Sequence, residues 1–145
     1  MQILLALHSL NRFVLLILLL VVIGKSLLGW LNKSPFEKAD DKFSLFLFIS
    51  THTQLLLGLI LYFVSPVVIF SGASMKDAVA RYWLVEHVAG MLVAIVLISL
   101  GRILSKKLSD STAKHKRLFI YNMVALLIIM IIMGQSHRGF LTVSW

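Results

Sequence analysis

The chain has 145 residues, of which 59% are hydrophobic and only 14% are charged, and its mean hydropathy is +0.95. A soluble globular domain is about 45–50% apolar and about 25% charged, so this composition excludes a soluble domain and a disordered chain. The formal net charge is +8, and the sequence contains no cysteine. Disulfides, iron–sulfur clusters, thiolate metal sites and cysteine nucleophiles are therefore excluded, which leaves the five histidines as the best candidates for chemistry.

Four apolar stretches are long enough to cross a bilayer core, which needs about 20 mainly apolar residues per helix. In chain order they cover roughly residues 4–30, 43–70, 82–104 and 118–137. Each should be a helix, because only a helix satisfies its own backbone groups in lipid. The first stretch lacks a basic region at its start, since the first positive charge is Arg12. We therefore interpret it as a transmembrane helix and not as a cleaved signal peptide.

The connections between these stretches are short, at residues 32–42, 71–81 and 105–117. Short loops place consecutive helices antiparallel and side by side. The sequence therefore predicts an all-α fold, an integral membrane antiparallel four-helix bundle that forms a single domain over residues 1–145.

Lys and Arg are distributed unevenly between the two ends of this bundle. Four lie at the end that holds the termini, and ten lie at the other end: Lys25, Lys33, Lys38, Lys42, Arg102, Lys106, Lys107, Lys114, Lys116 and Arg117. Positive residues favour the cytoplasmic side, so both termini are predicted to lie outside in a multi-pass protein of the inner (cytoplasmic) membrane. Anionic membrane lipid is a secondary partner of the basic face. Nucleic acid is not expected, because the basic loops carry no interleaved aromatic residues.

Ionisable residues inside a membrane are costly, so each is a functional candidate. At a helical rise of about 1.5 Å per residue, His8, His87 and His137 are predicted to share one level near the outer face. His115 falls in a basic loop and is interpreted as solvated. His52 is predicted deeper, on the second helix, beside a polar stripe that comprises Thr51, Gln54, Gly58, Tyr62 and Ser65.

Two histidines at matched depth on diagonally opposed helices could ligate a haem between them. His8 and His87 meet the depth condition, and Gly90 would let a flat ring approach, although small residues also serve helix packing. Arg12 lies one turn from His8. It is predicted to pair with Glu86 or with a cofactor carboxylate such as a haem propionate, or else to snorkel to the outer interface.

Other interpretations stay open at this point. His52 is a buried histidine satisfied by a hydroxyl or carbonyl, an alternative haem ligand, or a quinone or proton-relay group. A copper or zinc site could be assembled from His8, His87 and His137 with Glu86. A cofactor-free accessory subunit or small transporter is a third hypothesis, in which the polar stripe of the second helix faces a partner.

Several segments carry a resemblance to a known family. They are HSLNR at residues 8–12, HTQLLLGLILYF at 52–63 followed by SP at 65–66, EHVAGM at 86–91 and GR at 101–102. Together they resemble the small four-helix membrane proteins of Bacteroidetes that are commonly labelled cytochrome B. The resemblance covers nearly the whole chain and implies a b-type haem and electron transfer at the membrane. It supports His8, His52 and His87 as the important histidines, and His137 lies outside the pattern.

These features together predict an integral membrane haem b protein for electron transfer rather than a catalyst. His8 and His87 would be the axial ligands of the haem iron, Arg12 would pair with a propionate or with Glu86, and Gly90 would make room for the ring. A quinone or a redox partner protein is the expected electron-exchange partner. A homodimer is also considered, because the chain is small and carries a polar intramembrane stripe.

Overall fold

The computed structural model describes residues 1–136, and every regular element in that range is helical. The long helices are α1 (Gln2–Asn32), α2 (Lys38–Val64), α4 (His87–Lys106) and α5 (Ser111–Gln135). Three short elements join α2 to α4: η1 (Gly72–Lys76), α3 (Ala78–Arg81) and the π-helical turn η2 (Tyr82–Glu86). Residues 78–106 run on as one segment, and this segment, α1, α2 and α5 are each long and apolar enough to cross a membrane. The predicted all-α class with four apolar helices is confirmed.

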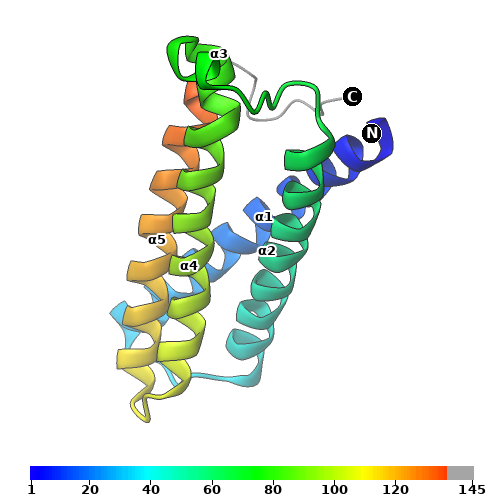
Figure 1. Cartoon of the computed structure of the whole chain (residues 1–145). Helices are drawn as coiled ribbons and strands as arrows, with labels where there is room; N and C mark the ends of the chain where they lie inside the picture. Colours follow the sequence, from blue (N-terminus) through cyan, green and yellow to red (C-terminus); the bar gives the residue numbers. More distant parts are fainter. Residues whose placement is uncertain (137–145) are drawn as a thin grey trace.

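The four long helices alternate in direction, as Figure 1 shows. The start of α1, the end of α2, the short α3 and the end of α5 lie at one end of the molecule, here called the α3 end. The α1–α2 and α4–α5 connections lie at the opposite end, here called the basic end. Helix α1 packs mainly against α2 and α5, and α4 packs tightly against α5 but loosely against α2. Helices α1 and α4 are therefore diagonal partners, as the sequence predicts.

The boundaries of two helices differ from the predicted ones because of local capping. Helix α2 ends at Val64, short of the predicted Phe70, because Ser65 precedes Pro66 and takes an extended conformation. Helix α5 begins at Ser111, well before the predicted residue 118, because the carboxylate of Asp110 accepts a hydrogen bond from the backbone N–H of Ala113 at 2.9 Å.

The earlier start of α5 overturns the interpretation of His115 as a solvated residue. His115 lies on the face of α5 that packs against α1, and only 2% of its surface is exposed. A Cβ at Gly29 of α1 would lie 2.5 Å from the His115 ring, so this glycine is what lets the ring fit against the helix. The ring of Phe36 covers the imidazole at a centroid distance of 5.2 Å.

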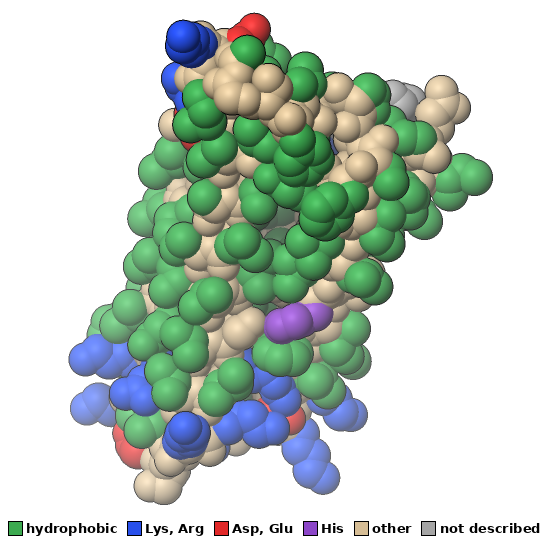
Figure 2. Space-filling view, viewed as in Figure 1, with side chains coloured by type: hydrophobic (Ala, Val, Ile, Leu, Met, Phe, Trp, Pro, Cys, Tyr) green, Lys and Arg blue, Asp and Glu red, His purple; other side chains and the backbone are tan. Residues whose placement is uncertain are grey.

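The surface of the bundle is divided by side-chain type. Large hydrophobic side chains cover its middle, as Figure 2 shows, and many of them are exposed, such as Ile17, Phe63 and Ile131. Lys and Arg gather at the basic end. Monomeric soluble proteins rarely expose apolar surface of this extent, so the surface fits a multi-pass membrane protein.

Candidate functional site

A cavity of about 170 Å³ lies between the helices toward the α3 end, and all four long helices line it. Its walls are mainly apolar, with Met91 and Ala94 of α4 and Met133 of α5 among them. Leu59 of α2 and Leu92 of α4 line the cavity and are also more than 40% exposed. The cavity therefore reaches the apolar surface between the two loosely packed helices, on the face seen in Figure 2.

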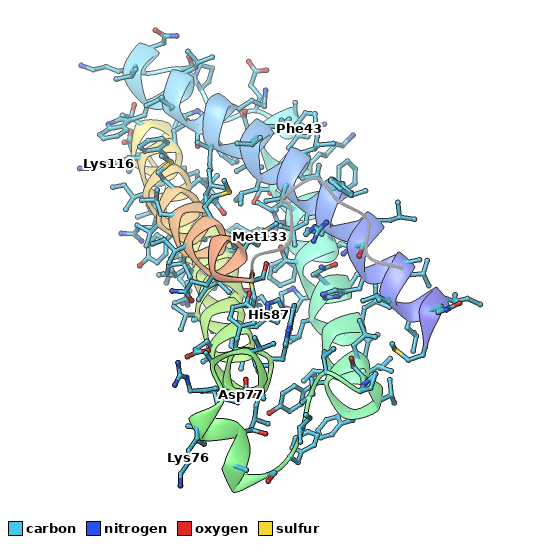
Figure 3. All side chains as sticks on the ribbon, turned by 90° about the horizontal axis from the view of Figure 1, so that it is seen from above. Phe43, Lys76, Asp77, His87, Lys116 and Met133 are labelled. Carbon is cyan, nitrogen blue, oxygen red and sulfur yellow. The ribbon has the colours of Figure 1, made fainter. Side chains whose placement is uncertain are left out.

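Two histidines predicted as ligands line this one cavity. His8 approaches it from α1 and His87 from the start of α4, so the two come from the diagonally opposed helices. In Figure 3, seen from the α3 end, His87 and Met133 lie in the space between the α1–α2 and α4–α5 pairs. His137 lies outside the described residues.

His8 belongs to a polar network that joins α1 to α2. The amide of Gln54 donates to the carbonyl oxygen of His8 at 3.0 Å and lies 3.4 Å from the Nε2 atom of its ring. The Gln54 oxygen accepts from Asn11 Nδ2 at 2.8 Å, which fixes the orientation of the amide. Asn11 in turn donates to the carbonyl oxygen of Ser50 at 3.0 Å. Polar side chains of this kind hold transmembrane helices together, and here they set the position of the His8 ring.

His87 is positioned by the π-helical turn that precedes it. The turn makes Tyr82 a buried residue and places its hydroxyl 3.4 Å from Nδ1 of His87. The same hydroxyl donates its proton to the carbonyl oxygen of Ile132 at 2.7 Å, so it can only accept from His87. In the tautomer in which Nδ1 of His87 donates to this hydroxyl, Nε2 keeps the lone pair that a metal ligand needs. Trp83 stands beside the imidazole with a centroid distance of 5.2 Å.

The charged candidates are separated by the fold. Glu86 pairs with Arg81, with 2.7 Å between Nε of the arginine and Oε1 of the glutamate. Arg12 lines the cavity and packs its guanidinium against the ring of Phe13, 5.1 Å from the centroid. Of the two carboxylate partners predicted for Arg12, Glu86 is therefore engaged by another arginine.

His52 does not line the cavity. It is the exposed histidine among those in residues 1–136. Its Nδ1 donates to the carbonyl oxygen of Phe48 at 2.8 Å, and the two rings lie 4.2 Å apart. Of the three interpretations of His52, this position agrees with a histidine satisfied by a carbonyl, although on the surface and not in the interior. His52 therefore supplies no polar group to the cavity.

The structure places Gly90 away from the cavity, facing α5. A Cβ at Gly90 would meet the side chain of Ile132 at 2.5 Å. Gly90 therefore permits close packing of α4 on α5, and a different glycine faces the histidine. A Cβ at Gly58 of α2 would lie 3.2 Å from Cε1 of His8.

Two buried polar atoms at the cavity lack a hydrogen-bond partner within residues 1–136. They are Nδ1 of His8 and Oγ1 of Thr51, and both residues line the cavity. Buried polar atoms without partners are rare in proteins, and each requires an explanation. A ligand with polar atoms that entered the cavity would give these two atoms a partner.

The sequence indicates His8, His87 and Arg12 as candidates, but it does not reveal the contacts that orient them. Gln54 and Gly58 belong to the predicted polar stripe of the second helix. Their i, i+4 spacing indicates that they lie on one helix face. The spacing does not show that the stripe faces His8. Tyr82 carried no signal of its own, because an aromatic residue near a helix end is typical of a membrane interface.

Comparison with known proteins returns no relative: the chain matches no protein-family model, no curated protein and no solved structure. Residues 1–136 also contain no group of three or more His, Cys, Asp or Glu side chains that could hold a metal ion. At the histidine cavity the polar groups include the imidazoles of His8 and His87, the guanidinium of Arg12 and the side chains of Thr51, Gln54 and Tyr82.

Proposed function

We propose that the protein is an integral membrane b-type haem protein for electron transfer. The observation that carries the proposal is that His8 and His87, from diagonally opposed helices, line one apolar cavity. Bundle cores bind cofactors through side chains on facing helices, and the two histidines would hold the iron of a bound haem.

Each group around the cavity has a role in this proposal. His8 and His87 would hold the iron, Arg12 would pair with a propionate, and Gly58 would leave the room that Gly90 was predicted to provide. Gln54 and Tyr82 would orient the two imidazoles through the contacts they already make. The bound haem would supply one-electron redox chemistry, and the protein would tune its potential through ligation and burial.

The electron-exchange partner is proposed to be a lipid-soluble quinone, with a redox partner protein as the alternative. The opening of the cavity between α2 and α4 supports the quinone, because Leu59 and Leu92 there are exposed to the surface that would face lipid. The proposed location is the inner membrane, with the basic end in the cytoplasm.

The first experiment is an absorption spectrum of detergent-purified protein, produced with haem supplied and recorded oxidised and then reduced with dithionite. We expect a strong Soret band and sharp α and β bands after reduction. His8→Ala and His87→Ala should each lose the haem, because each removes a side chain that would hold the iron. His52→Ala is the matched control and should keep the full haem content, because His52 lies outside the cavity.

A wild-type protein with a flat spectrum would refute the proposal. Full haem retention by both His8→Ala and His87→Ala would refute the ligand assignment. Loss of haem in His52→Ala alone would move the site to the outer face of α2.

The geometry of α2 does not favour the accessory-subunit hypothesis, which needs the polar stripe to face a partner. Thr51, Gln54, Gly58 and Tyr62 all line the cavity and so face the bundle interior. A partner would therefore have to bind elsewhere on the molecule.

A further inference from the structure

A second cavity, of about 300 Å³, lies at the basic end, between the α1–α2 connection and the helices α2, α4 and α5. Four cationic side chains line it, from three different segments: Lys38, Arg102, Lys106 and Lys114. Two carboxylates, of Glu37 and Asp41, also line it. Cations therefore outnumber carboxylates, and the cavity is suited to an anion.

Arg102 is the buried member of this set. It is 8% exposed, which is unusual for an arginine. Within residues 1–136, Arg102 makes three hydrogen bonds, and Nη1 donates all of them. The acceptors are the carbonyl oxygen and Oδ1 of Asp41 and Oγ of Ser44, at 3.1–3.3 Å. The Nε and Nη2 atoms of Arg102 make none within that range.

The two remaining nitrogens form one edge of the planar guanidinium. That edge presents parallel N–H groups, the geometry that binds two oxygens of a phosphate at once. Both carboxylates already have partners at the cavity: Asp41 pairs with the Nη1 side of Arg102, and Glu37 caps the start of α2. Lys114 is held beside the cavity by its contact with the ring of Phe36, 5.2 Å from the centroid.

The cavity also lies next to the apolar surface. Ile103, one turn before Lys106 on α4, is 44% exposed, and Phe46, about one turn after Asp41 on α2, is 48% exposed. An anion bound by Arg102 would therefore sit where the charged end of the molecule meets its apolar middle. Basic pockets between transmembrane helices on the cytoplasmic side bind anionic lipid head groups in this way.

We propose that this cavity binds a phosphate group, through the Nε–Nη2 edge of Arg102 and the ammonium groups of Lys38 and Lys106. The phosphate can come from a lipid head group or from the free ion. The site is separate from the histidine cavity, so it does not depend on the proposed function.

The test compares two double variants that each remove two positive charges from the same end. Lys38→Gln with Lys106→Gln removes charges that line the cavity, and Lys42→Gln with Lys107→Gln removes exposed charges that do not. Each purified protein, in neutral detergent, is titrated by calorimetry with short-chain phosphatidylglycerol, with short-chain phosphatidylcholine and with inorganic phosphate. The thermal unfolding of each variant, recorded in parallel, shows that it is folded.

We expect phosphatidylglycerol to bind the wild-type protein more tightly than phosphatidylcholine. The cavity variant should bind it about tenfold more weakly, and the control variant should stay close to wild type. Inorganic phosphate that competes with the lipid would identify the head-group phosphate as the bound moiety. Binding of inorganic phosphate without lipid, lost in the cavity variant alone, would support the same site with the free ion as its ligand. Equal weakening in both variants, or no binding of either anionic probe, would overturn the proposal.

Discussion

Gly58 and Gly90 both lie on helices that border the histidine cavity, but a side chain added to each would meet different neighbours. At Gly58 the neighbour is the His8 ring, and at Gly90 it is Ile132 of α5. At Gly90 an added Cβ would lie 2.5 Å from both Cδ1 and Cγ1 of Ile132, so this isoleucine would have to shift. At Gly58 an added Cβ would lie 3.2 Å from the His8 ring, whose Nε2 atom lies 3.4 Å from the Gln54 amide. Gly58 therefore leaves space for the His8 ring, whereas Gly90 allows α4 to pack closely on α5.

This difference gives a prediction at the scale of single residues. Gly58→Val should displace the His8 ring and weaken haem retention about tenfold, the equivalent of about 1.4 kcal/mol, which is typical of overpacking. Gly90→Ala should keep its haem but lose thermal stability, because the added Cβ would displace the Ile132 side chain and loosen the packing of α4 on α5. The measurement is the haem content per protein after purification and washing. Equal haem content in the two variants would contradict the assigned role of Gly58.

The position of a histidine along a helix is local information, whereas the direction in which its side chain points is not. The prediction that His8 and His87 share one depth comes from counting residues along each helix, because the helical rise is constant. Which side of the helix a histidine faces depends on its neighbours. His52 and Thr51 are adjacent in the chain, yet one is exposed and the other is completely buried at the cavity.

At the scale of helices, the packing of α1 on α5 depends on one close approach near the basic end. The His115 ring fills the space that a side chain at Gly29 would occupy. Buried close approaches of this kind use small residues, because they let two helices come near each other. The sequence alone places His115 in a loop, since the charges around it resemble a solvated segment. The Asp110 cap extends the helix through those charges and turns the ring inward.

Gly29→Ala is the corresponding prediction. The new Cβ would clash with the His115 ring, and we expect a loss of about 1–3 kcal/mol in the free energy of unfolding. Gly24→Ala is the matched control on the same helix, because nothing lies within 4 Å of a Cβ there. The comparison is made by thermal unfolding of both variants in detergent. A Gly29→Ala protein as stable as Gly24→Ala would show that the α1–α5 contact is looser than described.

On the scale of the whole molecule, the separation of charged and apolar surface predicts an orientation in the membrane. Most Lys and Arg side chains lie at one end, and this end holds the α1–α2 and α4–α5 connections (Figure 2). Because positive residues are retained in the cytoplasm, the α3 end should face outward.

The absence of cysteine makes this orientation directly testable. Single cysteines are introduced at two exposed positions, Ala73→Cys near α3 and Ser109→Cys between α4 and α5. We expect a membrane-impermeant maleimide to label Ala73→Cys in intact spheroplasts and to label Ser109→Cys only after permeabilisation. The reverse pattern would invert the predicted topology.

The number of helices, their apolar character and the uneven charge follow from the sequence alone, because span length and hydropathy are local properties of the chain. The prediction that His8 and His87 share one level rests on the same local counting. Only the tertiary structure decided which faces meet: Gln54 and Gly58 against His8, Tyr82 against His87, Gly90 against α5, and Arg102 and Lys106 around one cavity. In an apolar chain the hydrophobic pattern hardly distinguishes one helix face from another, so packing and a few buried polar contacts determine the rotation of each helix.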